Sequence, residues 1–297
     1  MDTRNLLNNR ATSARRPAHN PALFIFTALW CAAALALTYW AFVRTTTGQL
    51  LDESAFKEAE LLVSPQRLPI LQFLDSLPLI SVFLAGIVML AVSIYRRSLV
   101  PAVIAFITFA GANVTTQVLK RLLLDRPDRG VITLDFNSLP SGHTTLAASA
   151  AAVIFLLATP RWRPAAAFIG GTYAVLAGAA TVVNLWHRPA DVVASFLVVA
   201  AWTLLGGLAM MRLQPEWNRW QGRRHGSGVW GLLSWFAGLL SLVACAGSYL
   251  YARFLAPAST AADPLLPYFW WGLTLIIGVG YVLWALAIAL FNQQTGD

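Results

Sequence analysis

The sequence predicts an all-α fold that crosses a membrane several times, and two observations lead to this prediction. Hydrophobic residues make up 58% of the 297-residue chain and charged residues only 11%, with a mean hydropathy of +0.62. Soluble domains carry roughly a quarter of their residues as charges, so this composition excludes a soluble enzyme. The apolar residues also fall in uninterrupted runs of about 20, the length of a helix that crosses roughly 30 Å of hydrocarbon.

Eight such runs predict eight membrane-spanning helices, of which the fourth is the shortest. The runs cover residues 21–43, 77–95, 99–119, 143–159, 165–186, 189–211, 229–251 and 268–291. The first run is too long for a cleaved secretory signal and is typical of a signal anchor. The acidic loop at 44–76 is long enough to carry a short surface helix.

The runs divide the chain into four segments. A basic tail at 1–20 precedes a six-helix core at 21–211, a basic loop follows at 212–228, and a transmembrane helix pair at 229–297 ends the chain. Twelve of the 21 Lys and Arg residues lie in the tail or in loops on its side of the membrane. The positive-inside rule therefore predicts that both termini are cytoplasmic, in a multi-pass protein of the plasma membrane. This placement explains the net charge of +8, so nucleic acid is not expected as a partner.

Three polar segments interrupt the apolar pattern at the outer ends of predicted spans, so they can share one site. The first segment contains Lys120, Arg126 and Arg129. Basic residues at a helix end commonly anchor the helix at the membrane interface. This segment, however, lies on the side that disfavours positive charge, and Lys120 is one of only two lysines in the chain. A point charge combined with planar guanidinium groups indicates an anion site.

The second segment is Pro140-Ser141-Gly142-His143, which directly precedes an apolar helix. Backbone N–H groups converge at such a helix start and, together with the helix dipole, form a cradle for an anion. An ordinary turn in which Ser141 caps the helix fits the same residues. His143 at the mouth of the turn favours the functional interpretation.

The third segment begins at His187, continues with Arg188 and ends at Asp191, between the fifth and sixth spans. If this turn is helical, the i,i+4 spacing lets the carboxylate of Asp191 accept a hydrogen bond from the imidazole of His187. The second ring nitrogen then carries a directed lone pair and can act as a nucleophile or base. A histidine at a helix end with an acidic residue in the first turn is also a common structural pattern.

Together the three segments describe a site that binds a phosphoryl group and attacks it. No cluster of carboxylates able to hold Mg²⁺ or Zn²⁺ accompanies them in the sequence. Positive side chains must therefore neutralise the phosphate, and neither a metal nor another cofactor is predicted.

The order of these motifs resembles the type 2 phosphatidic acid phosphatase family over about residues 71–211, or over the six-helix core when the first span is added. The resemblance implies that Lys120 and Arg126 bind phosphate oxygens and that Ser141 and Gly142 donate hydrogen bonds to them. The family usually separates its Lys from the Arg-Pro pair by six residues, whereas five residues lie between them here.

The same resemblance assigns the catalytic residues. His187 would attack phosphorus and form a phosphohistidine, Asp191 would orient His187, and His143 would protonate the leaving oxygen. The predicted substrate is then a lipid phosphate.

The sequence departs from the family pattern where Ser-Arg is expected, six residues before the attacking histidine. Ala180 and Thr181 occupy those positions, so one of three expected phosphate-binding cations is missing. Arg188 is the first candidate to replace it and Arg129 the second, while Asn184 could supply a neutral donor.

These residues lead to the hypothesis of a metal-independent phosphatase whose site faces outward and whose substrate keeps its apolar tail in the bilayer. Polyprenyl diphosphate, polyprenyl-linked sugar phosphate and phosphatidic acid or phosphatidylglycerol phosphate all fit. A phosphotransferase that uses the same intermediate is one alternative. Thr181 suggests another alternative, a degenerate scaffold that binds lipid phosphate without turnover.

Overall fold

The computed structural model describes residues 20–61, 67–218, 228–255 and 266–295, and every regular element in these ranges is a helix. The predicted all-α fold is therefore confirmed. The elements are α2 (Pro21–Val43), α3 (Thr46–Leu61), α4 (Arg67–Arg96), α5 (Val100–Val118), the π-helical turn η1 (Leu119–Leu123), α6 (Gly142–Leu157), α7 (Arg163–Val183), α8 (Pro189–Leu213), the 3₁₀ turn η2 (Pro215–Asn218), α9 (Gly228–Phe254) and α10 (Pro267–Gln293).

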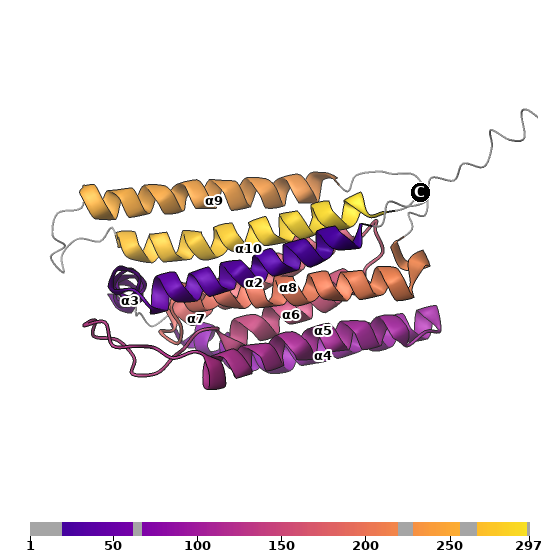
Figure 1. Ribbon diagram of the computed structural model, residues 1–297, viewed down its shortest axis with the longest axis horizontal. Coiled ribbons are helices and arrows are strands. Elements are labelled where there is room, and N and C mark those ends of the chain that lie inside the picture. Colours follow the sequence, from indigo (N-terminus) through magenta and orange to yellow (C-terminus); the bar gives the residue numbers. More distant parts are fainter. Residues whose placement is uncertain (1–19, 62–66, 219–227, 256–265, 296–297) are drawn as a thin grey trace, which may run out of the picture.

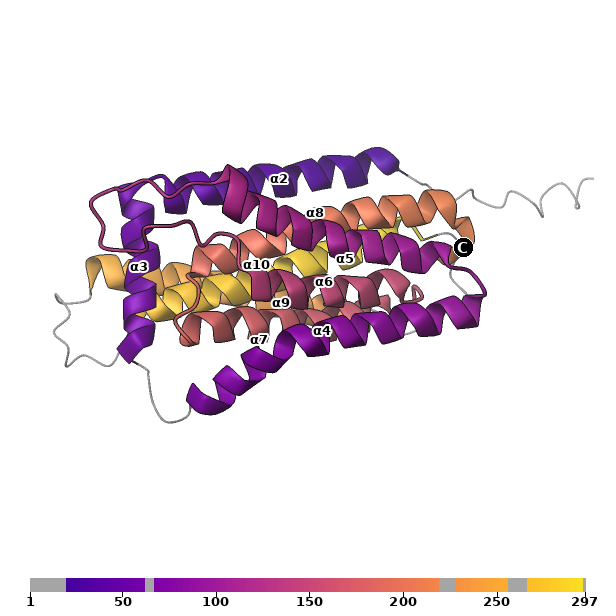
Figure 2. The ribbon, with the colours of Figure 1, turned by 90° about the horizontal axis from the view of Figure 1, so that it is seen from below.

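Eight of these helices run alternately up and down one long axis, and α3 lies across one end of the bundle (Figure 1, Figure 2). The N-terminal ends of α6, α8 and α10 are directed toward the end that α3 crosses. The two ends of the described chain meet at the opposite end, where the backbone N–H of Asn20 donates to Oε1 of Gln294 over 2.7 Å. The bundle thus has a chain-end face and an α3 face.

Seven of the described helices are long and apolar enough to cross a membrane, which supports a multi-pass membrane protein. The fourth predicted span is a helix, but it does not reach the length of a span. It is α6, with 16 residues, which extend about 24 Å at 1.5 Å per residue. Its N-cap residue Ser141 is completely buried, so the helix begins inside the protein instead of at the membrane surface.

α6 is the centre of the bundle and contacts α4, α5, α7 and α8. Small side chains allow this close packing, as is common between membrane helices. At Gly178 of α7, a Cβ atom would come within 2.5 Å of Cγ1 of Val192 in α8. This close crossing brings the end of α7 beside the start of α8, where the third polar segment lies.

Two further elements differ from the sequence prediction in length or form. α4 begins at Arg67, ten residues before the predicted start, and continues through Pro78 with a bend that Figure 2 shows. The end of α5 widens into the π turn η1, which carries Lys120. The predicted surface helix in the acidic loop is present as α3, and α10 attaches the C-terminal pair to α3, α7 and α8.

Candidate active site

The structure brings the three polar segments together at the α3 end of the bundle. The backbone N–H of Ser141 donates to the carbonyl oxygen of Asp191 over 3.0 Å, which ties the second segment to the third. The charges of Lys120 and Arg126 both interact with the charge of Asp191. Residues far apart in the sequence therefore lie close to one another.

His187 and Asp191 form the pair that their spacing predicts. Nδ1 of His187 lies 3.0 Å from Oδ2 of Asp191, and both side chains are buried. The same Oδ2 accepts the backbone N–H of Arg188 over 3.1 Å. Because the carboxylate engages Nδ1, the ring nitrogen left for chemistry is Nε2.

The turn before His187 is fixed by backbone hydrogen bonds at the end of α7. The N–H groups of Trp186 and His187 both donate to the carbonyl oxygen of Thr181, over 2.9 and 3.2 Å. Leu185 adopts a left-handed conformation with φ of 62°, as residues that end a helix by this pattern do. The hydroxyl of Thr181 donates to the carbonyl oxygen of Gly178 over 2.7 Å. Thr181 thus holds the loop with its backbone and turns its side chain back into its own helix.

The start of α6 is compatible with both interpretations of its sequence, a helix cap at Ser141 and a backbone cradle for an anion. Ser141 caps the helix, because its Oγ accepts from the N–H and the hydroxyl of Thr144 over 3.4 and 3.0 Å. The backbone N–H groups of Gly142 and His143 make no hydrogen bond to any described residue. Both can donate to a bound anion, whereas the N–H of Ser141 is used by the carbonyl oxygen of Asp191. The imidazole of His143 packs against Trp186, with ring centroids 4.9 Å apart, and its charge interacts with those of Lys120 and His187.

Arg188 is almost completely buried and has a partner that the sequence did not predict. Its Nε and Nη2 donate to Oε2 of Glu53 in α3 over 2.8 and 2.6 Å, and its guanidinium lies 4.6 Å from the ring of Phe56. Nη1 of Arg188 and Nε of Arg126 are both buried without a hydrogen-bond partner among the described residues. Burial lowers the pKa of Arg126, and the nearby positive charge of Arg188 lowers it further.

The two other residues considered for the missing cation lie in different surroundings. Arg129 is exposed, and no hydrogen bond or ion pair joins its side chain to a described residue, although its carbonyl oxygen accepts from the hydroxyl of Thr46 over 3.4 Å. Asn184 is buried at the C-terminal end of α7. The structure therefore joins Arg188 to Asp191, whereas no described contact joins the side chain of Arg129 to the predicted site residues.

Asp52 of α3 is a second acidic residue that sequence reasoning missed. Its Oδ1 accepts the backbone N–H of Ala190 over 3.0 Å. Burial and the neighbouring charge of Asp191 raise the pKa of Asp52 to about 7, against the opposing effects of the Ala190 N–H, Arg188 and Arg126. The signal in the sequence was the acidic character of the loop at 44–76, which reads equally well as a solvated surface.

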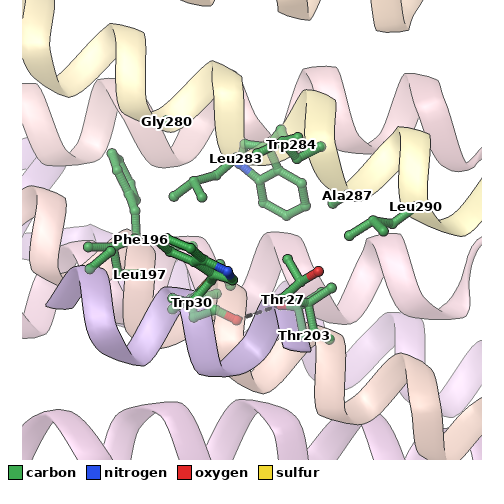
Figure 3. A pocket seen from close by; sticks show the side chains of 17 residues that line it. Thr27, Trp30, Phe196, Leu197, Thr203, Gly280, Leu283, Trp284, Ala287 and Leu290 are labelled. Carbon is green, nitrogen blue, oxygen red and sulfur yellow. Dashed lines mark hydrogen bonds between the residues drawn. The ribbon is translucent and has the colours of Figure 1, made fainter. Parts of the chain in front are cut away.

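An apolar cavity of about 220 Å³ lies apart from these residues, between α2, α8 and α10 (Figure 3). The hydroxyls of Thr27 and Thr203 in its wall donate to backbone carbonyls of their own helices. No predicted site residue is among the described residues that line it. The cavity suits a hydrocarbon chain and offers nothing to a phosphate.

No group of three or more His, Cys, Asp or Glu side chains within the described ranges is arranged to hold a metal ion. The charges that face the site come instead from Lys120, Arg126 and Arg188, with Asp52, Glu53 and Asp191 opposing them. The arrangement can bind an anion beside a histidine held by a carboxylate.

Comparison with known proteins identifies the family of this arrangement. A model of the PAP2 superfamily matches residues 18–219. The chain belongs to the PAP2 superfamily. Members are generally phosphatases, and the match runs from the start of α2 into the segment after η2, so it leaves out α9 and α10. No curated protein and no solved structure matched the chain.

Proposed function

We propose that this PAP2 protein is a membrane lipid phosphatase that works through a phosphohistidine on His187. The observation that carries the proposal is the pair of buried guanidinium nitrogens, Nη1 of Arg188 and Nε of Arg126, that lack partners among the described residues beside the His187–Asp191 pair. Unpaired buried donors are costly, and a phosphate supplies the acceptors that would satisfy them.

Arg188 replaces the family arginine in this proposal. Together with Lys120 and Arg126 it restores three cations around the phosphoryl group, and the N–H groups of Gly142 and His143 add two dipolar donors. A transferring phosphoryl group spreads charge over its oxygens, so fixed positive groups lower the barrier without a metal ion. The enzyme is then metal-independent.

The proposed reaction has two steps. Nε2 of His187 bonds to phosphorus while the bond from phosphorus to the leaving oxygen breaks, and His143 gives a proton to that oxygen. Water then attacks phosphorus, one of its protons passes to His143, and the P–N bond breaks to release phosphate. Asp191 stays ionised and holds the imidazole throughout.

The orientation of the site follows from its place in the fold. The ends of the described chain lie opposite the α3 face, and the basic tail and loops predict that the chain-end face is cytoplasmic. The active site then faces outward, where it meets the phosphate of a lipid whose tail stays in the bilayer.

Thr181 favours a second candidate, a scaffold that binds lipid phosphate without turnover, because it supplies no cation and its hydroxyl donates to the carbonyl oxygen of Gly178. Release of phosphate by purified protein separates the possibilities. The substrates are phosphatidic acid, a polyprenyl diphosphate and a polyprenyl-linked sugar phosphate in detergent micelles, each with and without EDTA. Phosphatase activity that survives EDTA is expected. Transfer to a lipid acceptor without free phosphate would identify a phosphotransferase, and binding without turnover would identify a scaffold.

A further inference from the structure

Helix α3 crosses the active-site end of the bundle and contacts α2, α7, α8 and α10 (Figure 2). Its inward side buries two carboxyl groups, Asp52 with 1% and Glu53 with 7% of the residue surface exposed. Buried carboxylates are costly unless they are paired. Their partners therefore show what this helix holds in place.

Glu53 holds the guanidinium of Arg188 on one edge. Its Oε2 accepts Nε and Nη2 of Arg188, and it also accepts the hydroxyl of Thr133 over 2.8 Å. Phe56, about one helical turn along α3 from Glu53, packs against the guanidinium. With this edge occupied and this face covered, Nη1 is the nitrogen of Arg188 that remains for another ligand.

Asp52 holds the first turn of α8. Its Oδ1 accepts the N–H of Ala190, one of the orphan donors at a helix start. Ala190 lies between Arg188 and Asp191, and the carboxylate of Asp191 fixes His187. The anchor on Ala190 therefore fixes the turn that carries the whole pair.

We propose that α3 is the positioning helix of the active site, in which Glu53 aims Arg188 at the phosphate and Asp52 anchors the turn that holds His187. This inference rests on the proposed function. Neither residue touches the reacting atoms, and both lie outside the motifs that carry the family resemblance. Without Glu53, the like charge of Arg126 would repel Arg188 from its position.

The test of Glu53 uses Glu53→Gln, which keeps the size of the side chain and removes its charge. Hydrolysis of phosphatidic acid in micelles gives kcat and KM, and competition by inorganic phosphate gives an inhibition constant. Small displacements of a binding group can cost roughly a hundredfold. We expect the inhibition constant and KM to rise about tenfold or more, with a smaller change in kcat. Loss of folded protein alone would lower the apparent kcat and leave the inhibition constant unchanged.

The test of Asp52 compares Asp52→Ala with Asp52→Asn, because asparagine keeps an oxygen that can accept the N–H of Ala190. At about pH 6, Asp52→Ala should lower kcat roughly tenfold to a hundredfold, with a smaller change in the inhibition constant of phosphate because Glu53 still holds Arg188. Asp52→Asn should restore most of that activity at about pH 6, where the pKa of about 7 keeps Asp52 largely protonated. This pair decides the proposal if Glu53→Gln does not fold.

Glu60→Gln is the matched control, since Glu60 is an exposed acidic residue of the same helix. The proposal is overturned if Glu53→Gln binds phosphate as Glu60→Gln does, or if Asp52→Asn is as impaired as Asp52→Ala. A wild-type protein that releases no phosphate would instead count against the proposed function. In that case the thermal shift caused by inorganic phosphate still tests Glu53, because positioning predicts a smaller shift in Glu53→Gln than in Glu60→Gln.

Discussion

At the scale of single residues, Arg188 is the side chain whose contacts bear most directly on the proposed chemistry. It follows His187 in the chain, its backbone N–H bonds to Asp191, and its guanidinium is held by Glu53. An arginine can keep five donors in a fixed plane, so one edge can be bound while another remains for a ligand. From the sequence alone, Arg188 and Arg129 were both candidates for the missing phosphate-binding cation. Arg188 is buried and Arg129 is exposed, so the structure favours Arg188.

We expect Arg188→Ala to lower kcat/KM by about two orders of magnitude or more, because it removes a cation from the phosphoryl group. The loss should be the same at low and high salt, since buried charges are weakly screened. Arg129→Ala should cause a small loss that salt diminishes. The measurement is kcat/KM for both variants at two ionic strengths.

Arg188→Ala also leaves the buried carboxylate of Glu53 without its ion-pair partner, which is itself destabilising. The double variant Arg188→Ala with Glu53→Gln removes that stranded charge and is the control. If the double variant regained wild-type activity, the role of Arg188 would be structural and the site would hold two cations.

Asp52 predicts a pH effect on substrate binding. Burial is the larger cause and the negative charge of Asp191 the smaller cause that raise the pKa of Asp52 to about 7. The neutral form is therefore favoured in the folded protein. Above about pH 7 the ionised form adds negative charge beside Asp191, and Arg126 and Arg188 then attract phosphate less strongly. KM should therefore rise between about pH 6 and pH 8, and Asp52→Asn should remove this part of the rise. An unchanged pH profile of KM in Asp52→Asn would contradict the assignment.

At the scale of elements, α10 supports the turn that carries His187 and Asp191. Gly272 of α10 packs directly against the ring of Pro189, the first residue of α8, and also against Ala55 of α3. Glu58 of α3 accepts the N–H of Phe269 near the start of α10 over 2.8 Å. The C-terminal pair lies outside the region that the family model matches, yet it contacts both elements that hold the site.

Gly272→Ala should therefore reduce activity, because the added methyl group would overlap the Pro189 ring and displace the start of α8 or α10. Gly247→Ala in α9 is the control, since a Cβ atom there meets nothing within 4 Å. The measurement is kcat together with the thermal unfolding midpoint in detergent. Equal activity in the two variants would show that α10 does not support the site.

Much of the fold could be predicted from apolar runs, because each span is a local property of the chain. The pairing of His187 with Asp191 could also be predicted, because a helical turn brings residues at i and i+4 together. The ion pair between Glu53 and Arg188 could not, since 135 residues separate the partners. In the sequence, Glu53 resembles any acidic residue of an interfacial helix, and only the packing of α3 across the bundle shows that it is buried.

At the scale of the whole molecule, the bundle separates two ends of different charge. The α3 end mixes both signs of charge, as in the ion pairs of Arg188 with Glu53 and of Arg44 with Asp125. The loops after α4 and α6, at the other end, carry arginines and no acidic residue. This asymmetry predicts that the chain-end face is cytoplasmic and that substrate reaches the site from outside.

Single cysteines in place of Arg97 and Arg129 test this orientation, because both positions are exposed. Arg97 follows the end of α4, whereas the carbonyl oxygen of Arg129 bonds to Thr46 at the start of α3. The native Cys31 and Cys245 are buried and should give little background. An impermeant thiol reagent should label the cysteine at 129, and not the one at 97, in intact cells. The reverse pattern would invert the protein and place its active site in the cytoplasm.

The central claim is that His187 forms a covalent bond with phosphorus. A rapid quench of the wild-type enzyme with a lipid radiolabelled in its phosphate tests that claim most directly. We expect a phosphoenzyme that is labile in acid, that maps to His187, and that is absent from His187→Ala, which should also have lost turnover. Phosphate release at the wild-type rate by His187→Ala, or stable label on another residue of the wild type, would contradict the mechanism.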